Sequence, residues 1–434
     1  MPSRLKSTDA SFATDFDTLL NIKREAQLNV EAVVSGIVQD VDARGDKALF
    51  EYTARFDRFE LSANSIRISA GEVLDAVKNC SEAQLGALQL AAKRIRTFHE
   101  KQLPEDLNYT DHDGVLLGLK WTAVEAVGMY VPGGLASYPS SVLMNAIPAK
   151  VAGTRRLVMV VPTPDGNLNP LVLAAASIAD VDEIYRVGGA QAIAALAFGC
   201  ESIAPVDKIV GPGNAYVATA KRQVFGVVGI DMIAGPSEIL VVADNKNDPS
   251  WIAADLLSQA EHDTSAQAIL ITDDANFADQ VCQAIDVHLQ NLSRSKIAGK
   301  SWEDFGVVIT IENMEYAMGL INRIAPEHLE LAIEAPEAFS KNIVNAGAIF
   351  LGRHTPEALG DYIGGPNHVL PTGRSARFSS GLGVLDFMKR TTLLGVSEQS
   401  IKVIGPAAVT LAKAEGLEAH ALSVALRMAK TDGT

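Results

Sequence analysis

From Val124 to about residue 351 the chain follows one rhythm, in which short apolar strand-like segments alternate with helical segments. The strand-like segments are 126–131, 156–164, 183–189, 207–213, one or two within 229–244, 268–272, 306–311 and 346–351. This alternation is typical of parallel strands, because each helix returns the chain to the edge of the sheet where the next strand starts. The sequence therefore predicts an α/β fold with mostly parallel, doubly wound sheets.

The length of the chain predicts more than one domain. It has 434 residues, whereas a single hydrophobic core stops growing at about 250–300 residues. We expect residues 128–235 to form one α/β domain. We expect residues 236–380 to form the other, together with the helical stretch 25–127. Residues 1–24 and 381–434 are then small terminal segments, the latter helical.

Charge and cysteine usage restrict the class of protein. The net charge of −15 argues against nucleic acid or an anionic membrane as the main partner. The N-terminus has no apolar core like that of a signal peptide, and no apolar run reaches the ~18 residues of a membrane span. Cys80, Cys200 and Cys282 are isolated thiols without CxxC spacing, as expected in a reducing cytoplasm.

Four glycine-rich turns are expected to lead from strands into helices. They are Pro132-Gly133-Gly134, Gly188-Gly189-Ala190-Gln191, Gly211-Pro212-Gly213-Asn214 and Gly235-Pro236-Ser237. The carboxyl ends of strands in a doubly wound sheet form a ligand crevice, and helix N-termini there favour anions such as a pyrophosphate. Taken singly, each turn is explained by tight turning alone. Four on one sheet favour a ligand crevice, although none matches the G-x-G-x-x-G fingerprint.

The helical stretch 251–263 carries a pair of metal-ligand candidates. Gln259 and His262 stand three residues apart, so their side chains leave the helix on one face. Further candidates are Glu327 with His328, Asp361 with His368, and Glu415 with His420. For each single histidine a structural role is the simpler interpretation, and His99 and His112 are expected to be solvated. Spacing does not establish that the candidates converge, but nitrogen and oxygen donors without thiolates suit a catalytic zinc site.

At these motifs the sequence resembles the histidinol dehydrogenase family. The matching stretches are MYVPGGLASYPSSVLMNAIPAKVAG, VGGAQAIAALAFG, VDKIVGPGNAYVATAKRQ, IDMIAGPSEILVVAD, DLLSQAEHD, APEHLEL and GDYIGGPNHVLPT. The resemblance runs from about residue 20 to the C-terminus. It implies a zinc- and NAD-dependent cytoplasmic homodimer with two large, incomplete Rossmann-like domains and small terminal segments.

The resemblance also implies roles for the candidate residues. The zinc ligands would be Gln259, His262, Asp361 and His420, the last reaching the site from the other subunit. Glu327 and His328 would be the acid/base residues. Ser237, His368 and Glu415 would bind substrate together with that pair and the zinc ligands, and Tyr130, Gln191 and Asn214 would line the NAD site.

The implied reaction takes L-histidinol through L-histidinaldehyde to L-histidine with two NAD+, the last step of histidine biosynthesis. No cysteine falls within a site motif, so water must add to the aldehyde before the second oxidation. The nearest alternative is a relative with the same chemistry and another polar alcohol as substrate, such as a sulfopropanediol. An alternative of a different class is a non-catalytic, zinc-stabilised binding protein.

Overall fold

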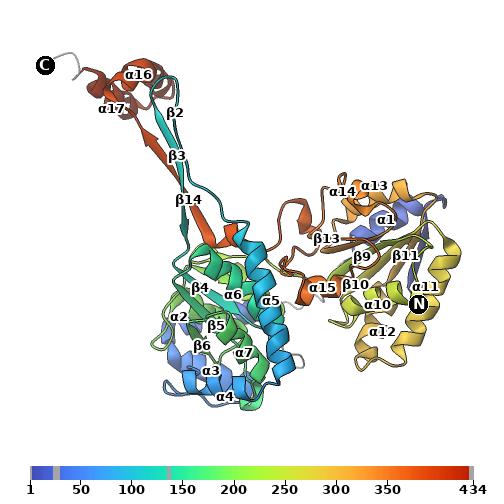
Figure 1. Ribbon diagram of the computed structural model, residues 1–434. Coiled ribbons are helices and arrows are strands. Elements are labelled where there is room, and N and C mark those ends of the chain that lie inside the picture. Colours follow the sequence, from blue (N-terminus) through green and yellow to red (C-terminus); the bar gives the residue numbers. More distant parts are fainter. Residues whose placement is uncertain (1, 23–29, 134–137, 430–434) are drawn as a thin grey trace.

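The protein is built on three sheets, two of them parallel (Figure 1). The computed structural model describes residues 2–22, 30–133 and 138–429. Gly134, in the first glycine turn, and the expected boundary at residue 24 lie outside the described residues. The two parallel sheets are each covered by helices on both faces, which confirms the predicted doubly wound α/β class.

The six-stranded sheet has the order β1-β11-β10-β9-β12-β13, and all of its pairs are parallel. Its strands are β1 (Ser3–Lys6), β9 (Glu238–Ala243), β10 (Gln267–Thr272), β11 (Val307–Thr310), β12 (His328–Ala332) and β13 (Ala348–Leu351). One face packs against α10 (Pro249–Ala260), α11 (Ala275–Leu289) and α12 (Ser295–Phe305). The other packs against α1 (Phe12–Leu20), α13 (Met314–Ile324) and α14 (Pro336–Ser340). A short helix, α15 (Glu357–Tyr362), follows β13.

The five-stranded sheet has the order β6-β5-β4-β7-β8 and is also parallel throughout. Its strands are β4 (Ala126–Tyr130), β5 (Arg156–Val160), β6 (Glu183–Tyr185), β7 (Lys208–Val210) and β8 (Gly229–Ile230). One face packs against α4 (Ala70–Lys78), α5 (Glu82–Glu100), α6 (Pro139–Ala152) and α7 (Pro170–Ile178). The other packs against α2 (Glu31–Arg44), α3 (Asp46–Asp57), α8 (Gly189–Phe198) and α9 (Ala215–Val224).

Counted from its own first strand, each sheet has the Rossmann order 3-2-1-4-5, with β1 added at the edge of the larger one. In this topology the order in which strands are added to the sheet reverses between the neighbours β4 and β7, and in the other sheet between β9 and β12. These two switch points are where each sheet is most open to a ligand.

The packing of α2 to α5 differs from the expected domain grouping. These helices cover the five-stranded sheet, whereas residues 25–127 were expected to join 236–380. The reason is the apolar face of α2: Val34, Ile37 and Val41 are buried in the same core as Ile193 of α8 and Val158 of β5. Periodicity identifies such a face but not its partner.

The third sheet forms an arm that projects from the body of the molecule (Figure 1). It is antiparallel, in the order β14-β3-β2, and consists of β2 (Leu107–Thr110), β3 (Leu116–Ala123) and β14 (Met388–Gly395). The arm ends in α16 (Glu398–Ala414) and α17 (Glu418–Ala429). The segment 381–434, expected to be helical, therefore also contains a strand, because β14 pairs with β3 along eight residues. Short 3-10 turns occur at Pro164–Gly166, Ser375–Arg377 and Val384–Phe387.

Among the described residues, no helix is both long enough and apolar enough to cross a lipid bilayer.

Candidate active site

The candidate residues of the six-stranded half meet at the amino ends of β9 and β12. Ser237 directly precedes β9, and His328, preceded by Glu327, is the first residue of β12. Gln259 lies near the end of α10, which starts beyond the carboxyl end of β9 and returns to this edge. The turn that contains Ser237 was expected to lead from a strand into a helix; instead it leads into β9.

His328 is held in one tautomer by the backbone. Its Nδ1 lies 2.9 Å from the carbonyl oxygen of Glu238, which can only accept, so Nδ1 carries the hydrogen. Nε2 is buried and has no hydrogen-bond partner among the described residues. In its neutral form this imidazole therefore presents a bare lone pair at Nε2, as a general base requires.

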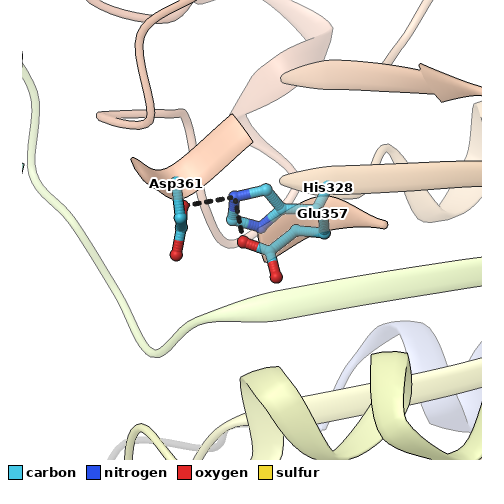
Figure 2. A group of neighbouring side chains, drawn as sticks. All are labelled: His328, Glu357 and Asp361. Carbon is cyan, nitrogen blue, oxygen red and sulfur yellow. Dashed lines mark ion pairs between the residues drawn. The ribbon is translucent and has the colours of Figure 1, made fainter. Parts of the chain in front are cut away.

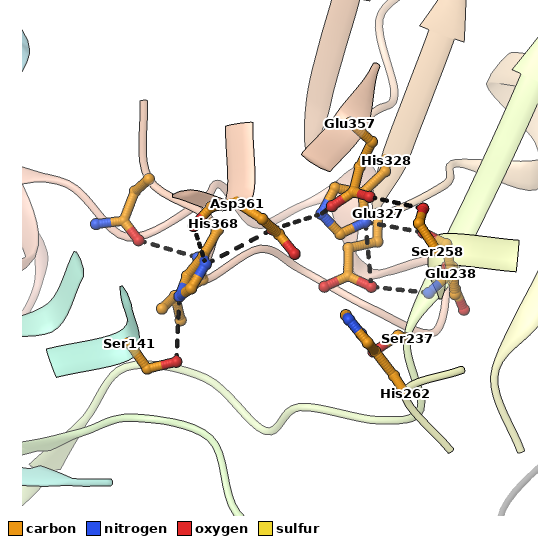
Figure 3. Close-up of polar contacts among 12 residues, drawn as sticks. Ser141, Ser237, Glu238, Ser258, His262, Glu327, His328, Glu357, Asp361 and His368 are labelled. Atoms are coloured by element: carbon orange, nitrogen blue, oxygen red, sulfur yellow. Dashed lines mark hydrogen bonds and ion pairs between the residues drawn. The ribbon is translucent and has the colours of Figure 1, made fainter. Parts of the chain in front are cut away.

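Glu327 lies beside this imidazole and is also buried. Its Oε2 accepts a hydrogen bond of 2.9 Å from the backbone N–H of Glu238 and lies 3.6 Å from His328 Nδ1. Both acid/base candidates are therefore anchored to the same residue at the start of β9 (Figure 3). The pair is rigid and adjacent, with one carboxylate and one neutral imidazole.

Asp361, on α15, connects this pair to His368. Asp361 Oδ1 lies 4.0 Å from His328 Nε2 and 3.6 Å from His368 Nδ1. Burial opposes the charge of Asp361, but the hydrogen bond with His368 and the two imidazoles hold its pKa below the ordinary value. His368 Nε2 lies 3.3 Å from Ser141 Oγ, which links the site to α6 of the other half (Figure 3).

Gln259 and His262 are the remaining candidate residues of the six-stranded half. His262 Nδ1 lies 3.4 Å from Ser237 Oγ, and burial lowers the pKa of this imidazole, which favours the neutral form that binds metals. Gln259 is fully buried, and both its Oε1 and its Nε2 lack hydrogen-bond partners among the described residues. A buried amide without partners is costly, so this position fits a group that the protein is built to hold.

A compact group of side chains that could hold a metal ion is also present at this site. One ligand atom each of His328, Glu357 and Asp361 lie within 4.8 Å of one another (Figure 2). The nitrogen and oxygen donors available here include no thiolate, as expected for a catalytic zinc ion rather than a structural one.

Buried carboxyl groups surround this edge of the sheet. Burial, together with the charge of Asp361, raises the pKa of Glu357 to about 8. Burial also raises the pKa of Asp255 to about 6 and, together with the Asp255 charge, raises that of Glu330 well above its ordinary value. Burial therefore favours the protonated forms of Glu357 and Glu330, whereas Asp361 keeps its charge.

The carboxyl ends of β4, β6 and β7 open into a second candidate site. A cavity of about 1010 Å³ is lined there by Tyr130, Gly189, Gln191 and Asn214. The Tyr130 hydroxyl accepts a 3.2 Å hydrogen bond from the N–H of Gly189, whose φ of +68° only glycine adopts readily. Asn214 caps the N-terminus of α9. Three of the four glycine turns therefore lie at this crevice, as predicted.

Glu415 and His420 do not join the other candidates within one chain. They are exposed and lie at the end of the arm, on either side of the break between α16 and α17 (Figure 1). Of the four zinc ligands that the resemblance implied, three therefore lie in the same region of one chain: Gln259, His262 and Asp361.

Sequence reasoning missed Ser141, Glu238 and Glu357. For Glu357 a signal existed, because it precedes Asp361 by four residues and so shares one face of α15. Glu238 acts mainly through its backbone, and Ser141 comes from a distant helix. Neither carries a local signal.

Comparison with known proteins identifies the family. The histidinol dehydrogenase family model matches residues 21–428. The chain is 65% identical over 429 residues to a histidinol dehydrogenase of Rhodospirillum rubrum, covering 99% of both chains. It is 62% identical over 433 residues to one of Ruegeria pomeroyi, covering 100% of both. The chain belongs to the histidinol dehydrogenase family.

A solved member of this family has the same fold. The crystal structure of the histidinol dehydrogenase from Elizabethkingia anophelis matches with a TM-score of 0.95 and 37% identity, over 100% of this chain and 99% of that one. The resemblance found in the sequence is confirmed, and with it the prediction that the chain is an oxidoreductase of the histidinol dehydrogenase family.

Proposed function

We propose that this protein oxidises L-histidinol to L-histidine through L-histidinaldehyde, using two NAD+ and one zinc ion per subunit, as the last step of histidine biosynthesis. The observation that carries the proposal is the convergence of Glu327 and His328 with metal donors at one buried edge, in a chain of the histidinol dehydrogenase family. An acid/base pair beside a metal group argues against a purely structural or binding role.

The proposed zinc ligands of this chain are Gln259, His262 and Asp361. Gln259 contributes a neutral oxygen, His262 a neutral imidazole and Asp361 one negative charge, so a dication keeps a net positive charge and can accept nitrogen donors from a substrate. His420 of the partner subunit is the proposed fourth ligand. When bound, zinc orients the imidazole and amino nitrogens of the substrate, and NAD+ accepts one hydride in each oxidation.

His328 is the proposed base of the first oxidation. Its Nε2 takes the hydroxyl proton of histidinol while a hydride leaves the carbon atom that bears this hydroxyl, which yields the aldehyde. Glu327 is the proposed base of the second. Its carboxylate takes a proton from water as the remaining hydroxide adds to the aldehyde carbon. The resulting gem-diol, as its monoanion, loses the second hydride to NAD+ and becomes the acid.

Other candidates bind substrate or dinucleotide in this proposal. Ser237 and His368 lie within reach of the substrate, next to the metal ligands. Tyr130, Gln191 and Asn214 line the cavity at the other sheet, which we propose as the NAD site. The free thiols of Cys80, Cys200 and Cys282 support a cytoplasmic location.

We further propose a homodimer whose active sites are shared between subunits. The arm leaves large apolar side chains exposed, among them Leu394, Val403, Leu411, Leu422 and Leu426. So many exposed apolar side chains on one projecting element favour a protein interface there. Docking of the arm on a second copy would bring Glu415 and His420 to the partner's site, where Glu415 would offset the positive charge of the substrate amino group.

Mixed dimers test the sharing of sites. Co-expression of Glu327→Gln and His420→Asn chains with different affinity tags yields heterodimers in which one of the two sites carries neither substitution. We expect such heterodimers to recover about half of the wild-type rate of L-histidine formation, while neither variant homodimer forms L-histidine at a comparable rate. Verified heterodimers as inactive as the homodimers would show that each site is self-contained.

Substrate identity is tested by NADH formation from histidinol and from sulfopropanediol under the same conditions. We expect turnover with histidinol, loss of it after chelation, and recovery with added zinc while circular dichroism stays unchanged. Turnover with sulfopropanediol alone would assign the chain to the alternative substrate. Zinc that stabilises the fold without any turnover would favour the non-catalytic alternative.

A further inference from the structure

Glu357 is a buried carboxyl group whose position is fixed from two directions and which has one oxygen without a partner among the described residues. It is 1% exposed. Its Oε2 accepts a hydrogen bond from Ser258 Oγ at 3.2 Å, and its backbone N–H donates to Glu330 Oε1 at 2.5 Å. Its Oε1 is buried and has no hydrogen-bond partner among the described residues. A buried acceptor held this firmly requires a donor.

The matching donor is the amide nitrogen of Gln259. The hydrogen bond from Ser258, the residue before Gln259, places Glu357 against this last turn of α10, although no hydrogen bond joins Gln259 and Glu357 themselves in this structure. A carboxamide binds a metal through its oxygen, because its nitrogen only donates. Once Oε1 of Gln259 faces a metal, its Nε2 points away from the ion and needs an acceptor. Glu357 Oε1 is the unused acceptor on that side.

A direct ligand role for Glu357 is the competing interpretation, since Glu357 forms a compact group with His328 and Asp361. That group would occupy His328 Nε2, the one nitrogen free to act as a base. Glu357 Oε1 lies 3.8 Å from this nitrogen. An arrangement with Glu357 behind Gln259 leaves both the metal donors and the base available.

We propose that Glu357 is a positioning residue that accepts a hydrogen bond from Gln259 Nε2 and thereby presents Gln259 Oε1 to the zinc ion. The inference rests on the proposed function, because it assumes the zinc site. Residues that orient metal ligands typically contribute a factor of about 10–100 to metal affinity. The effect is therefore measurable on the metal itself, without any assay of turnover.

The test is the dissociation constant of Zn²⁺, measured by competition with a chelator on the full-length metal-free protein. Glu357→Leu is expected to weaken zinc binding by about 10–100-fold. Glu357→Gln is expected to weaken it by about 3–10-fold, because a neutral carboxamide oxygen accepts less strongly than a carboxylate. Asp255→Asn is the matched control: it removes an acid of the same helix as Gln259, one turn away, and is expected to leave the affinity unchanged.

A double-mutant cycle separates positioning from simple charge attraction. In a Gln259→Ala background, Glu357→Gln is expected to have no further effect on zinc affinity, because the group it orients is gone. Equal effects in both backgrounds would overturn the inference, as would wild-type affinity in Glu357→Gln or Glu357→Leu. Complete loss of zinc in Glu357→Gln would make Glu357 a ligand and overturn it as well. A wild-type protein that binds no zinc would instead refute the proposed function.

Discussion

The two parallel sheets have the same strand order but place their candidate sites at opposite edges. The five-stranded sheet uses its carboxyl edge, where glycine turns, Gln191 and the N-terminus of α9 surround an open cavity. The six-stranded sheet uses its amino edge, where α10 ends beside Gln259 and buried charged groups gather. Helix N-termini favour anions and C-termini favour cations. One topology thus offers a crevice suited to a dinucleotide at the carboxyl ends of one sheet and donors suited to a metal ion at the amino ends of the other.

The largest expected effect is loss of zinc from the proposed site at the amino ends of β9 and β12. His262→Asn removes an imidazole donor near the end of α10 and is expected to abolish both bound zinc and histidinol oxidation. Zinc content by atomic absorption, measured on protein with an unchanged circular dichroism spectrum, checks this. One zinc ion per subunit retained in the variant would rule out His262 as a ligand.

Glu327→Gln is expected to divide the reaction in two. The first oxidation should persist, because His328 keeps its tautomer through the carbonyl of Glu238. The second should slow by about 100- to 10,000-fold, the usual contribution of a general base. Separate assays with histidinol and with histidinaldehyde distinguish the steps, and full turnover from histidinol would remove Glu327 as the base.

A substitution in the proposed NAD site, at the carboxyl ends of β4, β6 and β7, should change NAD+ binding and leave zinc binding intact. Asn214→Ala removes part of the cavity lining and the cap of α9, so we expect the KM for NAD+ to rise about fivefold, given about 1 kcal/mol for a lost cap or hydrogen bond. Zinc content and the KM for histidinol should stay at wild-type values. A variant that loses zinc instead would show that the two edges are not separate sites.

The smallest expected effect concerns His99, a histidine of the five-stranded half with no role in a site. It is fully buried, and burial lowers its pKa. The folded state therefore binds fewer protons than the unfolded chain, in which histidine has a pKa of about 6.5. Stability contributed by neutral His99 is complete above that pH and falls as the pH decreases toward the lower folded pKa.

Replacement by a group that does not titrate checks this sign. His99→Gln is expected to reduce the loss of stability between pH 7 and 5, seen as a smaller decrease of the melting temperature than in the wild type. Equal decreases in both proteins would mean that His99 is protonated without cost in the folded state.

The local parts of the fold were predictable from the sequence. Gln259 and His262 could be paired because they are close in sequence, although α10 ends at Ala260 and His262 lies in the turn that follows. Most strands of both sheets follow from short apolar runs, but β1 and β12 were not predicted. The partner of α2 was assigned wrongly, because an apolar face fits either sheet. His99 was expected to be solvated, yet its helix turns it into the core beside Ile95. Packing between segments far apart in the sequence determines both the partner of α2 and the burial of His99.

The site was predictable as a set of residues but not as a geometry. Family resemblance supplied Asp361 and His328, whereas the backbone anchor at Glu238 and the support from Glu357 depend on the register of β9 with β12 and on α15. The use of the amino edge was not foreseen either. Strand-to-helix turns direct attention to carboxyl ends, and the return of α10 to the other edge has no sequence motif.

The ratio of NADH formed to histidinol consumed tests the central claim most directly. A four-electron oxidation at one site predicts two NADH and one L-histidine for each histidinol, with no aldehyde accumulating in solution. A ratio of one with the aldehyde as product, or no reaction of histidinol with the zinc-loaded protein, would contradict the account.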